Sequence, residues 1–219
     1  MSAPVSKVPR SLRMLGVCLV LCFAATRGIG AFDVSAGVKW ATSPVSYYVN
    51  PTNLDLPTSV VPPAVQVGAD AWSLQTNASF RFQYAGASSV TTNANDGVNV
   101  VMFRNASSGS AIATTYWWSS GSRIIDADIV FWDAGFTFFT GSTGCANGFY
   151  IEDIAAHEFG HALGLGHSTS TAATMYPSVS YCNTSNRSLD IDDINGVQTL
   201  YPPMPVPTAP TGVRIVPGL

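Results

Sequence analysis

All three histidines of this 219-residue chain lie within one stretch, HEFGHALGLGH, which runs from His157 to His167. His157 and His161 are four residues apart, so on a helix both side chains project from the same face. Gly164 can then end the helix in a left-handed conformation, and this turn brings His167 back toward the other two rings. Three neutral imidazoles with one open coordination position describe a catalytic zinc site rather than a closed structural one.

Glu158 directly follows the first histidine of the stretch. A carboxylate at this position can accept a proton from a water that the metal activates, and so act as a general base. A short His-Glu-x-x-His pattern can also arise by chance on an amphipathic helix. Here chance would have to place every histidine of the chain at ligand spacing. We therefore expect zinc to bind His157, His161 and His167.

The same stretch resembles the HExxHxxGxxH motif of the metzincin metalloendopeptidases at every fixed position. Metzincins also have a methionine-containing turn beneath the zinc, and the resemblance makes Met175, in ATMYP, the candidate for that turn. The alternative for Met175 is an ordinary core methionine. In either case we expect the side chain to pack rather than to coordinate the metal.

Further motifs resemble the matrixins, the matrix metalloproteinase branch of the metzincins. Val38–Pro51 resembles the first strand of the matrixin catalytic domain, Asp126–Phe138 resembles its last sheet strand, and Leu189–Pro202 resembles its C-terminal helix. The resemblance spans about residues 32–202. It implies zinc-dependent hydrolysis of peptide bonds in a protein or peptide substrate, with Glu158 as the general base.

The pattern of apolar residues predicts an α+β domain with a twisted, mostly parallel sheet and about three helices. Strands are expected at residues 45–49, 80–84, 98–103, 112–118 and 124–131, and helices at residues 62–75, 149–164 and 189–201. In metzincins an antiparallel edge strand above the zinc binds the substrate backbone as an added strand. Residues 109–116 are the candidate for that edge strand, and the pattern fits an ordinary core strand nearly as well.

The N-terminus is typical of a secretory signal peptide. Basic residues precede an apolar run at 14–25, which is shorter than the roughly twenty residues that a bilayer span requires. Small residues allow cleavage after Ala24, Ala25 or Ala31, and cleavage after Ala31 would make Phe32 the first residue. In matrixins the freed N-terminal residue can pair with an aspartate of the last helix, so the resemblance offers Asp192 or Asp193 as the partner.

We therefore expect a secreted, extracellular protein in three parts. Residues 1–31 would form the signal peptide, residues 32–202 the matrixin-like zinc metallopeptidase domain, and residues 203–219 a proline-rich tail or linker. After removal of the signal we expect no membrane association, and we expect a monomer.

Two of the four cysteines, Cys18 and Cys22, would leave with the signal peptide. The remaining pair, Cys145 and Cys182, is expected to form a disulfide bond because the chain is predicted to be exported. Two buried free thiols are the alternative. The disulfide would connect the segment before the zinc helix to the segment after the methionine turn.

The composition excludes nucleic acid as an expected partner. Charged residues make up 11% of the chain, the formal net charge is −3, and the sequence has no basic patch. Because all histidines are already used, we expect no second, structural zinc of the matrixin type. Calcium remains possible at five acidic residues, for which exposed, solvated carboxylates are the alternative: Asp126, Asp128, Asp133, Glu152 and Asp153.

The leading hypothesis is a secreted zinc endopeptidase acting on extracellular proteins. One alternative is a non-catalytic, zinc-containing binding or adhesion module on a protease fold, although such a module has no need of Glu158. Another is a zinc hydrolase for a non-peptide ester or amide. The substrate side chain that the enzyme prefers is not predicted, because Pro177 and Tyr181 depart from the matrixin pattern of pocket residues.

Overall fold

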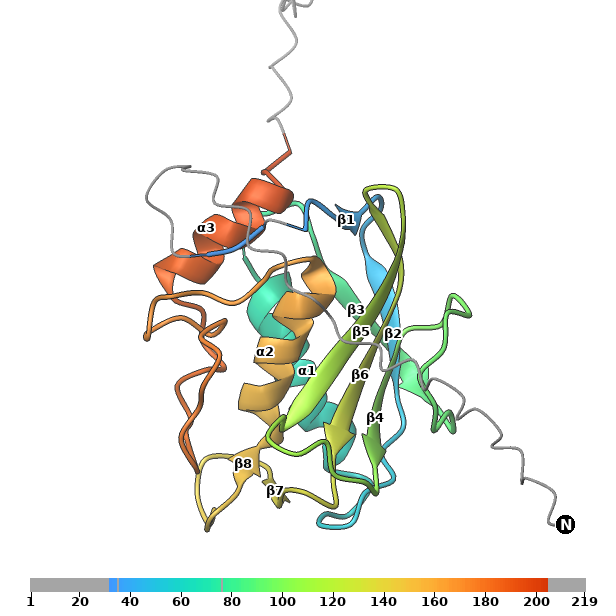
Figure 1. Ribbon diagram of the computed structural model, residues 1–219, viewed down its shortest axis with the longest axis vertical. Helices are drawn as coiled ribbons and strands as arrows, with labels where there is room; N and C mark the ends of the chain where they lie inside the picture. The colour runs from blue at the N-terminus through green and yellow to red at the C-terminus, as the bar shows by residue number, and fades with distance from the viewer. Residues whose placement is uncertain (1–31, 35, 76, 205–219) are drawn as a thin grey trace, which may run out of the picture.

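A computed structural model describes residues 32–34, 36–75 and 77–204. The expected signal peptide (1–31) and all but the first two residues of the expected tail (203–219) lie outside this range. The described part contains a six-stranded sheet, a two-stranded sheet and three helices (Figure 1). These elements confirm the predicted α+β class.

The larger sheet is parallel except at one edge. Its strands are β1 (Lys39–Trp40), β2 (Val45–Val49), β3 (Phe82–Ala87), β4 (Val100–Arg104), β5 (Ala113–Ser120) and β6 (Arg123–Trp132). The order is β1-β6-β4-β2-β3, with every pair parallel, while β5 pairs with β6 antiparallel. This arrangement confirms the predicted mostly parallel sheet with an antiparallel edge strand.

The edge strand lies later in the chain than predicted. It covers Ala113–Ser120 rather than residues 109–116. Gly109 has a φ of +87°, a left-handed conformation that interrupts an extended strand, so the preceding residues form a loop. At the other end Gly121, with a φ of +60°, opens the tight turn that leads into β6.

The helices are α1 (Val61–Ser73), α2 (Ile151–Leu163) and α3 (Ile191–Leu200). The predicted helix at 149–164 begins two residues too early, because Phe149–Tyr150 forms strand β8 and pairs with β7 (Phe138–Phe139). At α3, Asp190 caps the first turn by accepting a hydrogen bond from the Asp192 N–H. Within the described ranges, no helix has the length and apolar character needed to span a membrane.

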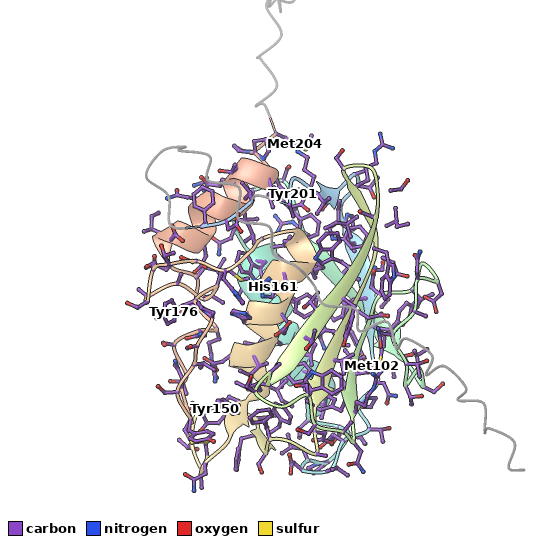
Figure 2. The ribbon with its side chains drawn as sticks, viewed as in Figure 1. Met102, Tyr150, His161, Tyr176, Tyr201 and Met204 are labelled. Atoms are coloured by element: carbon purple, nitrogen blue, oxygen red, sulfur yellow. A yellow bond between two sulfur atoms is a disulfide. The ribbon has the colours of Figure 1, made fainter. Side chains whose placement is uncertain are left out.

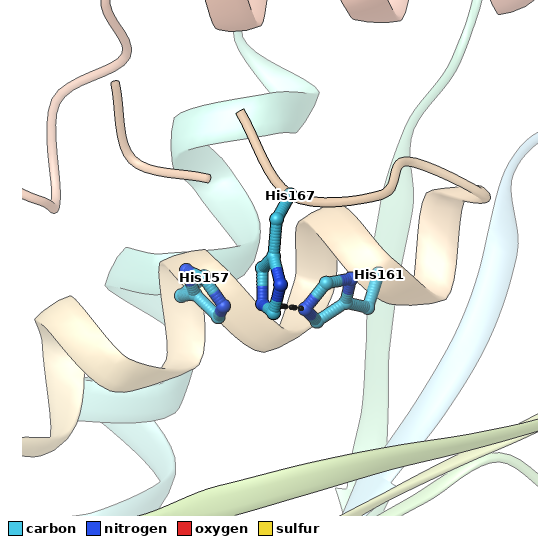
Figure 3. Close-up of side chains that lie close together, drawn as sticks. All are labelled: His157, His161 and His167. Atoms are coloured by element: carbon cyan, nitrogen blue, oxygen red, sulfur yellow. Dashed lines mark hydrogen bonds between the residues drawn. The ribbon is translucent and has the colours of Figure 1, made fainter. Parts of the chain in front are cut away.

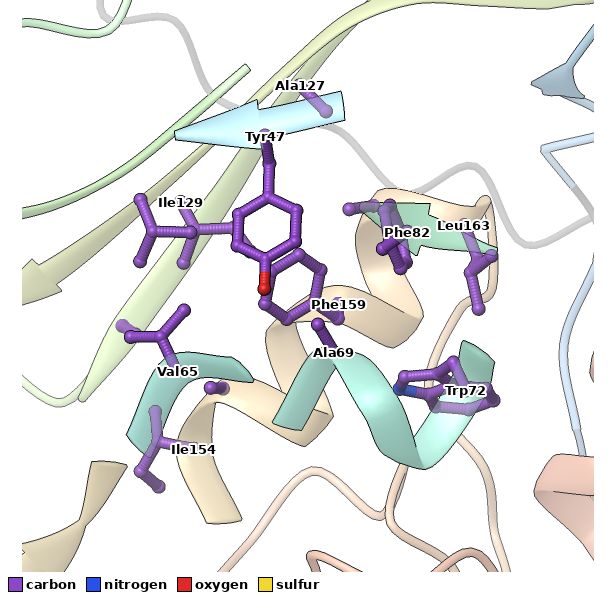
Figure 4. Close-up of a cluster of buried hydrophobic side chains, with 14 of the residues drawn as sticks. Tyr47, Val65, Ala69, Trp72, Phe82, Ala127, Ile129, Ile154, Phe159 and Leu163 are labelled. Carbon is purple, nitrogen blue, oxygen red and sulfur yellow. The ribbon is translucent and has the colours of Figure 1, made fainter. Parts of the chain in front are cut away.

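The main core lies between the sheet and helices α1 and α2. The rings of Tyr47 and Phe82, from two neighbouring strands, pack on Phe159 of α2 with centroids 4.9 and 4.7 Å away (Figure 4). Gly68 of α1 touches α2 so closely that a β-carbon there would lie 2.6 Å from Ala155 Cβ. These contacts fix the rotation of α2, and therefore the direction in which its polar face points.

The opposite face of the sheet carries a smaller apolar cluster formed by Val100, Met102, Val130 and Trp132. The loop before β4 packs beside this face through two buried carboxylates of β6. Asp126 accepts hydrogen bonds from the N–H groups of Asp96 and Gly97, and Asp128 accepts them from Ala94 and Val100. Backbone amides therefore replace water around these charges.

Candidate metal centre and active site

Helix α2 ends at a glycine that turns the chain back over the helix. Gly164 has a φ of +103°, and a side chain there would also overlap the carbonyl oxygen of Val38. The N–H of Leu165 then donates to the carbonyl of Gly160 at 3.1 Å. This is the left-handed helix end that the sequence predicted, and it returns the chain toward the polar face of α2.

The three histidines converge on one point. One ring nitrogen from each of His157, His161 and His167 can be chosen so that all three lie within 4.8 Å of one another. Nε2 of His161 is 3.2 Å from Nε2 of His167, and Figure 3 shows the three rings meeting between α2 and the segment that follows it. Among the described residues, no other group of three histidines, cysteines or carboxylates is close enough to hold one ion.

Backbone carbonyls determine which nitrogens face this point. Nδ1 of His157 is 2.7 Å from the carbonyl oxygen of Thr174, and Nδ1 of His161 is 2.9 Å from that of Leu165. A carbonyl oxygen only accepts, so each Nδ1 carries the ring hydrogen and each Nε2 keeps a lone pair. Carbonyls that orient imidazoles in this way are typical of metal ligands.

The spacing of the nitrogens suits a tetrahedral metal. The Nε2 atoms of His161 and His167 are 3.2 Å apart, a distance that needs a hydrogen or a cation between them because two lone pairs would repel each other. In a tetrahedral zinc site with bonds of about 2.0–2.1 Å, two nitrogens lie roughly 3.3 Å apart. The donor set and its spacing therefore fit zinc.

The environment of the rings favours their neutral form. The pKa of His157 is lowered to about 4, mainly by burial; the neighbouring His167 adds to the lowering and the hydrogen bond to Thr174 opposes it. Burial also lowers the pKa values of His161 and His167, with additional lowering by the adjacent imidazole in each case. The histidines are therefore neutral near pH 7, as metal ligands must be.

Glu158 lies on the side of α2 that faces the edge strand. Its carboxylate is buried and accepts a hydrogen bond from the hydroxyl of Thr115, at 2.7 Å from Oε2. Burial raises the pKa of Glu158, while His161 and the Thr115 hydrogen bond oppose that rise. A carboxylate with a raised pKa is a better proton acceptor than a solvated one, as general-base chemistry requires.

Met175 lies beneath the histidines, in a turn held by α3. The carboxylate of Asp193 accepts hydrogen bonds from the N–H groups of Thr174 and Met175, at 2.8 and 3.0 Å. The Met175 side chain is buried and packs against Gly160 of α2. Because Thr174 also accepts from His157, this turn connects the last helix to a predicted ligand.

A cavity of about 800 Å³ opens beside the histidines. One wall is the edge strand β5, and the opposite wall is the segment 176–181 that follows Met175. Pro177, Val179 and Tyr181 all contribute to this second wall. Figure 2 shows His161 between β5 and the segment that carries Tyr176.

A disulfide bond fastens the outer wall of this cavity. Cys145 and Cys182 are joined, with their Cα atoms 5.5 Å apart. The Cys182 N–H donates to the carbonyl of Gly148 at 2.9 Å, and the Tyr181 ring packs on Phe149 at 5.0 Å between centroids. The wall is thus attached to the segment that leads into α2.

The five acidic residues considered for calcium are all buried, so their interpretation as exposed, solvated carboxylates is wrong. Backbone amides approach each of them; for example, Asp133 accepts from Leu54 and Glu152 accepts from Gly141. Asp153 forms an ion pair with Arg187, which also lies over the Tyr150 ring. Asp126 and Asp128 lie on β6, Asp133 directly follows it, and Glu152 and Asp153 lie in the first turn of α2.

The start of the described chain lies against the last helix. The N–H of Phe32 donates to Asp192 Oδ1 at 3.1 Å, and the other oxygen of Asp192 accepts from the Ser168 hydroxyl at 2.7 Å. Of the two aspartates that the sequence offered as partners of Phe32, Asp192 makes this contact. Asp193 instead holds the Met175 turn.

Two site residues were missed from the sequence. Thr115 was placed on the candidate edge strand without a role, and Arg187 was not considered. Both act through partners more than thirty positions away, Glu158 and Asp153, so neither has a local sequence signature. The alternation of β5, which places every second residue over α2, was the one signal that could have indicated Thr115.

Residues 39–202 match the family model of the matrixins. Matrix metalloproteinase-20 of Homo sapiens is 30% identical over 186 residues, which cover 78% of this chain and 35% of that protein. Matrix metalloproteinase-18 of Xenopus laevis is 31% identical over 179 residues, covering 82% and 37% respectively.

The similarity is highest over a shorter segment. Neutrophil collagenase of Homo sapiens is 52% identical over 59 residues, which cover 27% of this chain and 13% of that protein. The chain spans little more than a third of the length of even the two metalloproteinases that it matches over most of its own length.

Proposed function

This chain belongs to the matrixin family, and from that premise we propose that it is a secreted, zinc-dependent endopeptidase that hydrolyses peptide bonds of extracellular proteins. The observation that carries the proposal is the convergence of three imidazoles, two of them oriented by backbone carbonyls, beside a buried carboxylate. His157, His161 and His167 would hold zinc through ring nitrogens, and Glu158 would act as the general base.

When bound, zinc would supply Lewis-acid chemistry, which makes a water more acidic and polarises a carbonyl. Glu158 accepts the proton that the water loses as its oxygen attacks the scissile carbonyl carbon. The same carboxyl then donates this proton to the leaving amine, so it is regenerated in each turnover. The raised pKa of Glu158 supports both transfers.

The edge strand β5 is the surface to which we assign the substrate backbone. One side of β5 pairs with β6, so the other side has backbone groups that an extended peptide can bind as an added strand. The cavity between β5 and residues 176–181 would receive one substrate side chain beside the scissile bond. Its apolar lining, including Phe149 and Val179, favours an apolar side chain.

The test is digestion of casein or gelatin by the purified protein, with and without a zinc chelator, beside the variant Glu158→Ala. We expect cleavage that the chelator abolishes, that added zinc restores, and that the variant lacks. Binding of the protein without cleavage would instead support the non-catalytic module, and cleavage of small esters alone would support the non-peptide hydrolase. Cleavage unaffected by chelation would refute the zinc mechanism.

We further propose calcium as a structural ion. Three carboxylate oxygens are buried without a hydrogen-bond partner among the described residues: Asp126 Oδ1, Asp133 Oδ1 and Glu152 Oε2. Calcium prefers oxygen ligands and would satisfy such atoms. Thermal unfolding in calcium and in a calcium-selective chelator should then differ, and identical midpoints would contradict this assignment.

We propose that residues 1–31 are removed on secretion. Cleavage after Ala31 would convert the Phe32 N–H, which already contacts Asp192, into an ammonium group beside a carboxylate. N-terminal sequencing of secreted protein should read Phe32 first. A start at Ala25 or Thr26 would move the cleavage site to one of the earlier alternatives.

A further inference from the structure

We propose that Thr115 is a positioning residue that holds the carboxylate of Glu158 in the orientation needed for catalysis. This inference rests on the endopeptidase function proposed above. It assigns Thr115 a specific contribution to turnover: the hydroxyl binds one carboxylate oxygen and thereby leaves the other for the reacting water.

The fold brings Thr115 to the carboxylate from a different element. Thr115 lies on β5 opposite Ile129 of β6. Ile129 is buried in the core beneath the helices, and directly paired residues on neighbouring strands point to the same face of a sheet. The Thr115 side chain therefore points toward α2, where its hydroxyl lies 2.7 Å from Glu158 Oε2.

The same hydroxyl also lies 2.9 Å from the backbone carbonyl oxygen of Glu158. Thr115 thus touches both the main chain and the end of the side chain of one residue, which restricts the three rotatable bonds of the glutamate. Among the residues that the structure describes, Thr115 supplies the only hydrogen bond to this carboxylate. Removal of the hydroxyl would leave the carboxylate without a fixed orientation.

The contact also distinguishes the two carboxylate oxygens. Oε2 accepts from Thr115, so Oε1 remains to take the proton from the water and to return it to the leaving amine. Thr115 neither gains nor loses a proton in this cycle. Pre-orientation of a catalytic group lowers the barrier because the group need not be ordered in the transition state.

A purely structural role makes a different prediction. Thr115 is β-branched and lies in a strand, where valine has the same shape and an equally high preference. If the residue served only to fill space, Thr115→Val would be silent and Thr115→Ser would be the more damaging change. If the hydroxyl positions Glu158, Thr115→Val is instead the more damaging change and Thr115→Ser retains most of the activity.

The experiment compares kcat and KM on a fluorogenic peptide for wild type, Thr115→Val and Thr115→Ser, with zinc content and thermal unfolding measured for each. We expect Thr115→Val to lower kcat by roughly ten- to a hundredfold, the range for a lost hydrogen bond to a charged group, with a KM change below about twofold. Thr115→Ser should restore most of kcat. Thr199→Val, which removes an exposed hydroxyl bonded to the Asn195 carbonyl, should match wild type.

If wild type is active and the kcat of Thr115→Val is within about twofold of it, the positioning role is wrong and the endopeptidase function still stands. Equal losses of kcat in the valine and serine variants would have the same meaning. If Thr115→Val does not fold, Thr115→Ala takes its place in the same contrast with serine. A wild-type protein no more active than Glu158→Ala would overturn the endopeptidase function itself, and the role of Thr115 with it.

Discussion

Met175 packs directly beneath Gly160, so closely that a β-carbon at position 160 would overlap the methionine sulfur and lie 2.7 Å from Trp72 Cζ2. Gly160 is on the helical turn between His157 and His161, so this contact fixes the distance of both predicted ligands from the core. Glycine is needed here for space and not for backbone freedom, since its conformation is helical.

Gly160→Ala should therefore destabilise the protein, although the same change on an open helix would stabilise it by about 1 kcal/mol. We expect the free energy of unfolding to fall by roughly 1–3 kcal/mol, as for other overpacked cores, together with weaker zinc binding. Urea denaturation and a chelator competition measure the two effects. Gly196→Ala on α3, where the nearest atom is the tip of Leu165 at 3.1 Å, should cost less, and equal losses would contradict the role of the Met175 contact.

Glu158→Ala should keep its zinc and lose proteolysis. The Glu158 carboxylate does not belong to the three-histidine group that would hold the metal, so the zinc content by elemental analysis should match wild type. Loss of a general base lowers turnover by roughly a hundred- to ten-thousandfold. Retained cleavage of an unfolded protein substrate, or loss of the metal with the carboxylate, would contradict the assigned role.

Replacement of both Cys145 and Cys182 by serine should lower the free energy of unfolding by on the order of 3–4 kcal/mol, because a long loop loses its covalent closure. We also expect a higher KM, since the Tyr181 wall of the cavity is then attached only by non-covalent contacts. Wild type under reducing conditions is the matched comparison. If reduction leaves both stability and KM unchanged, the disulfide does not support the wall.

Asp128 should make stability depend on pH in a defined direction. The pKa of Asp128 is raised from an ordinary 3.8 to about 6, mainly by burial; Asp126 and Asp96 add to the rise, and the two backbone hydrogen bonds oppose it. The folded state therefore binds more protons than the unfolded state between about pH 4 and pH 6, and this contribution to stability decreases as the pH rises through that window.

The measurement compares wild type with Asp128→Asn at pH 5 and at pH 7, with metal content held constant. The stability of wild type relative to the variant should be greater at pH 5 than at pH 7, by about 1 kcal/mol. The quantity to compare is the change, between pH 5 and pH 7, in the difference in unfolding free energy between wild type and variant. The difference at a single pH is not informative, because asparagine also alters the two amide contacts. A difference that is constant with pH would show that Asp128 does not titrate in this range.

The parts of the site that the sequence predicted depend on local geometry. The separation of His157 from His161, and the left-handed conformation of Gly164, are properties of one helix and its end. The helix expected at residues 189–201 and the strand expected at residues 45–49, observed as α3 and β2, are equally local. Such features follow from helix and strand periodicity before any tertiary contact forms.

The parts that were missed or misplaced depend on partners distant in the chain. The edge strand is defined by its pairing with β6, which the apolar pattern of residues 109–116 does not contain. Asp126 and Asp128 were expected to be solvated because their amide donors lie about thirty residues earlier, in the loop before β4 and at its first residue, where the sequence has no motif. Thr115 and Glu158 meet only after the sheet and helix have packed.

The link between Cys145 and Cys182 encloses every residue assigned to the chemistry on α2 and in the turns after it: His157, Glu158, His161, His167 and Met175. Together they occupy one closed covalent ring. A single backbone cut anywhere in that ring, including one made by a second copy in the proposed endopeptidase function, leaves the two pieces covalently linked, so they can keep their native packing. At a high local concentration of the proposed peptidase, this link would therefore limit the loss of active sites through autoproteolysis.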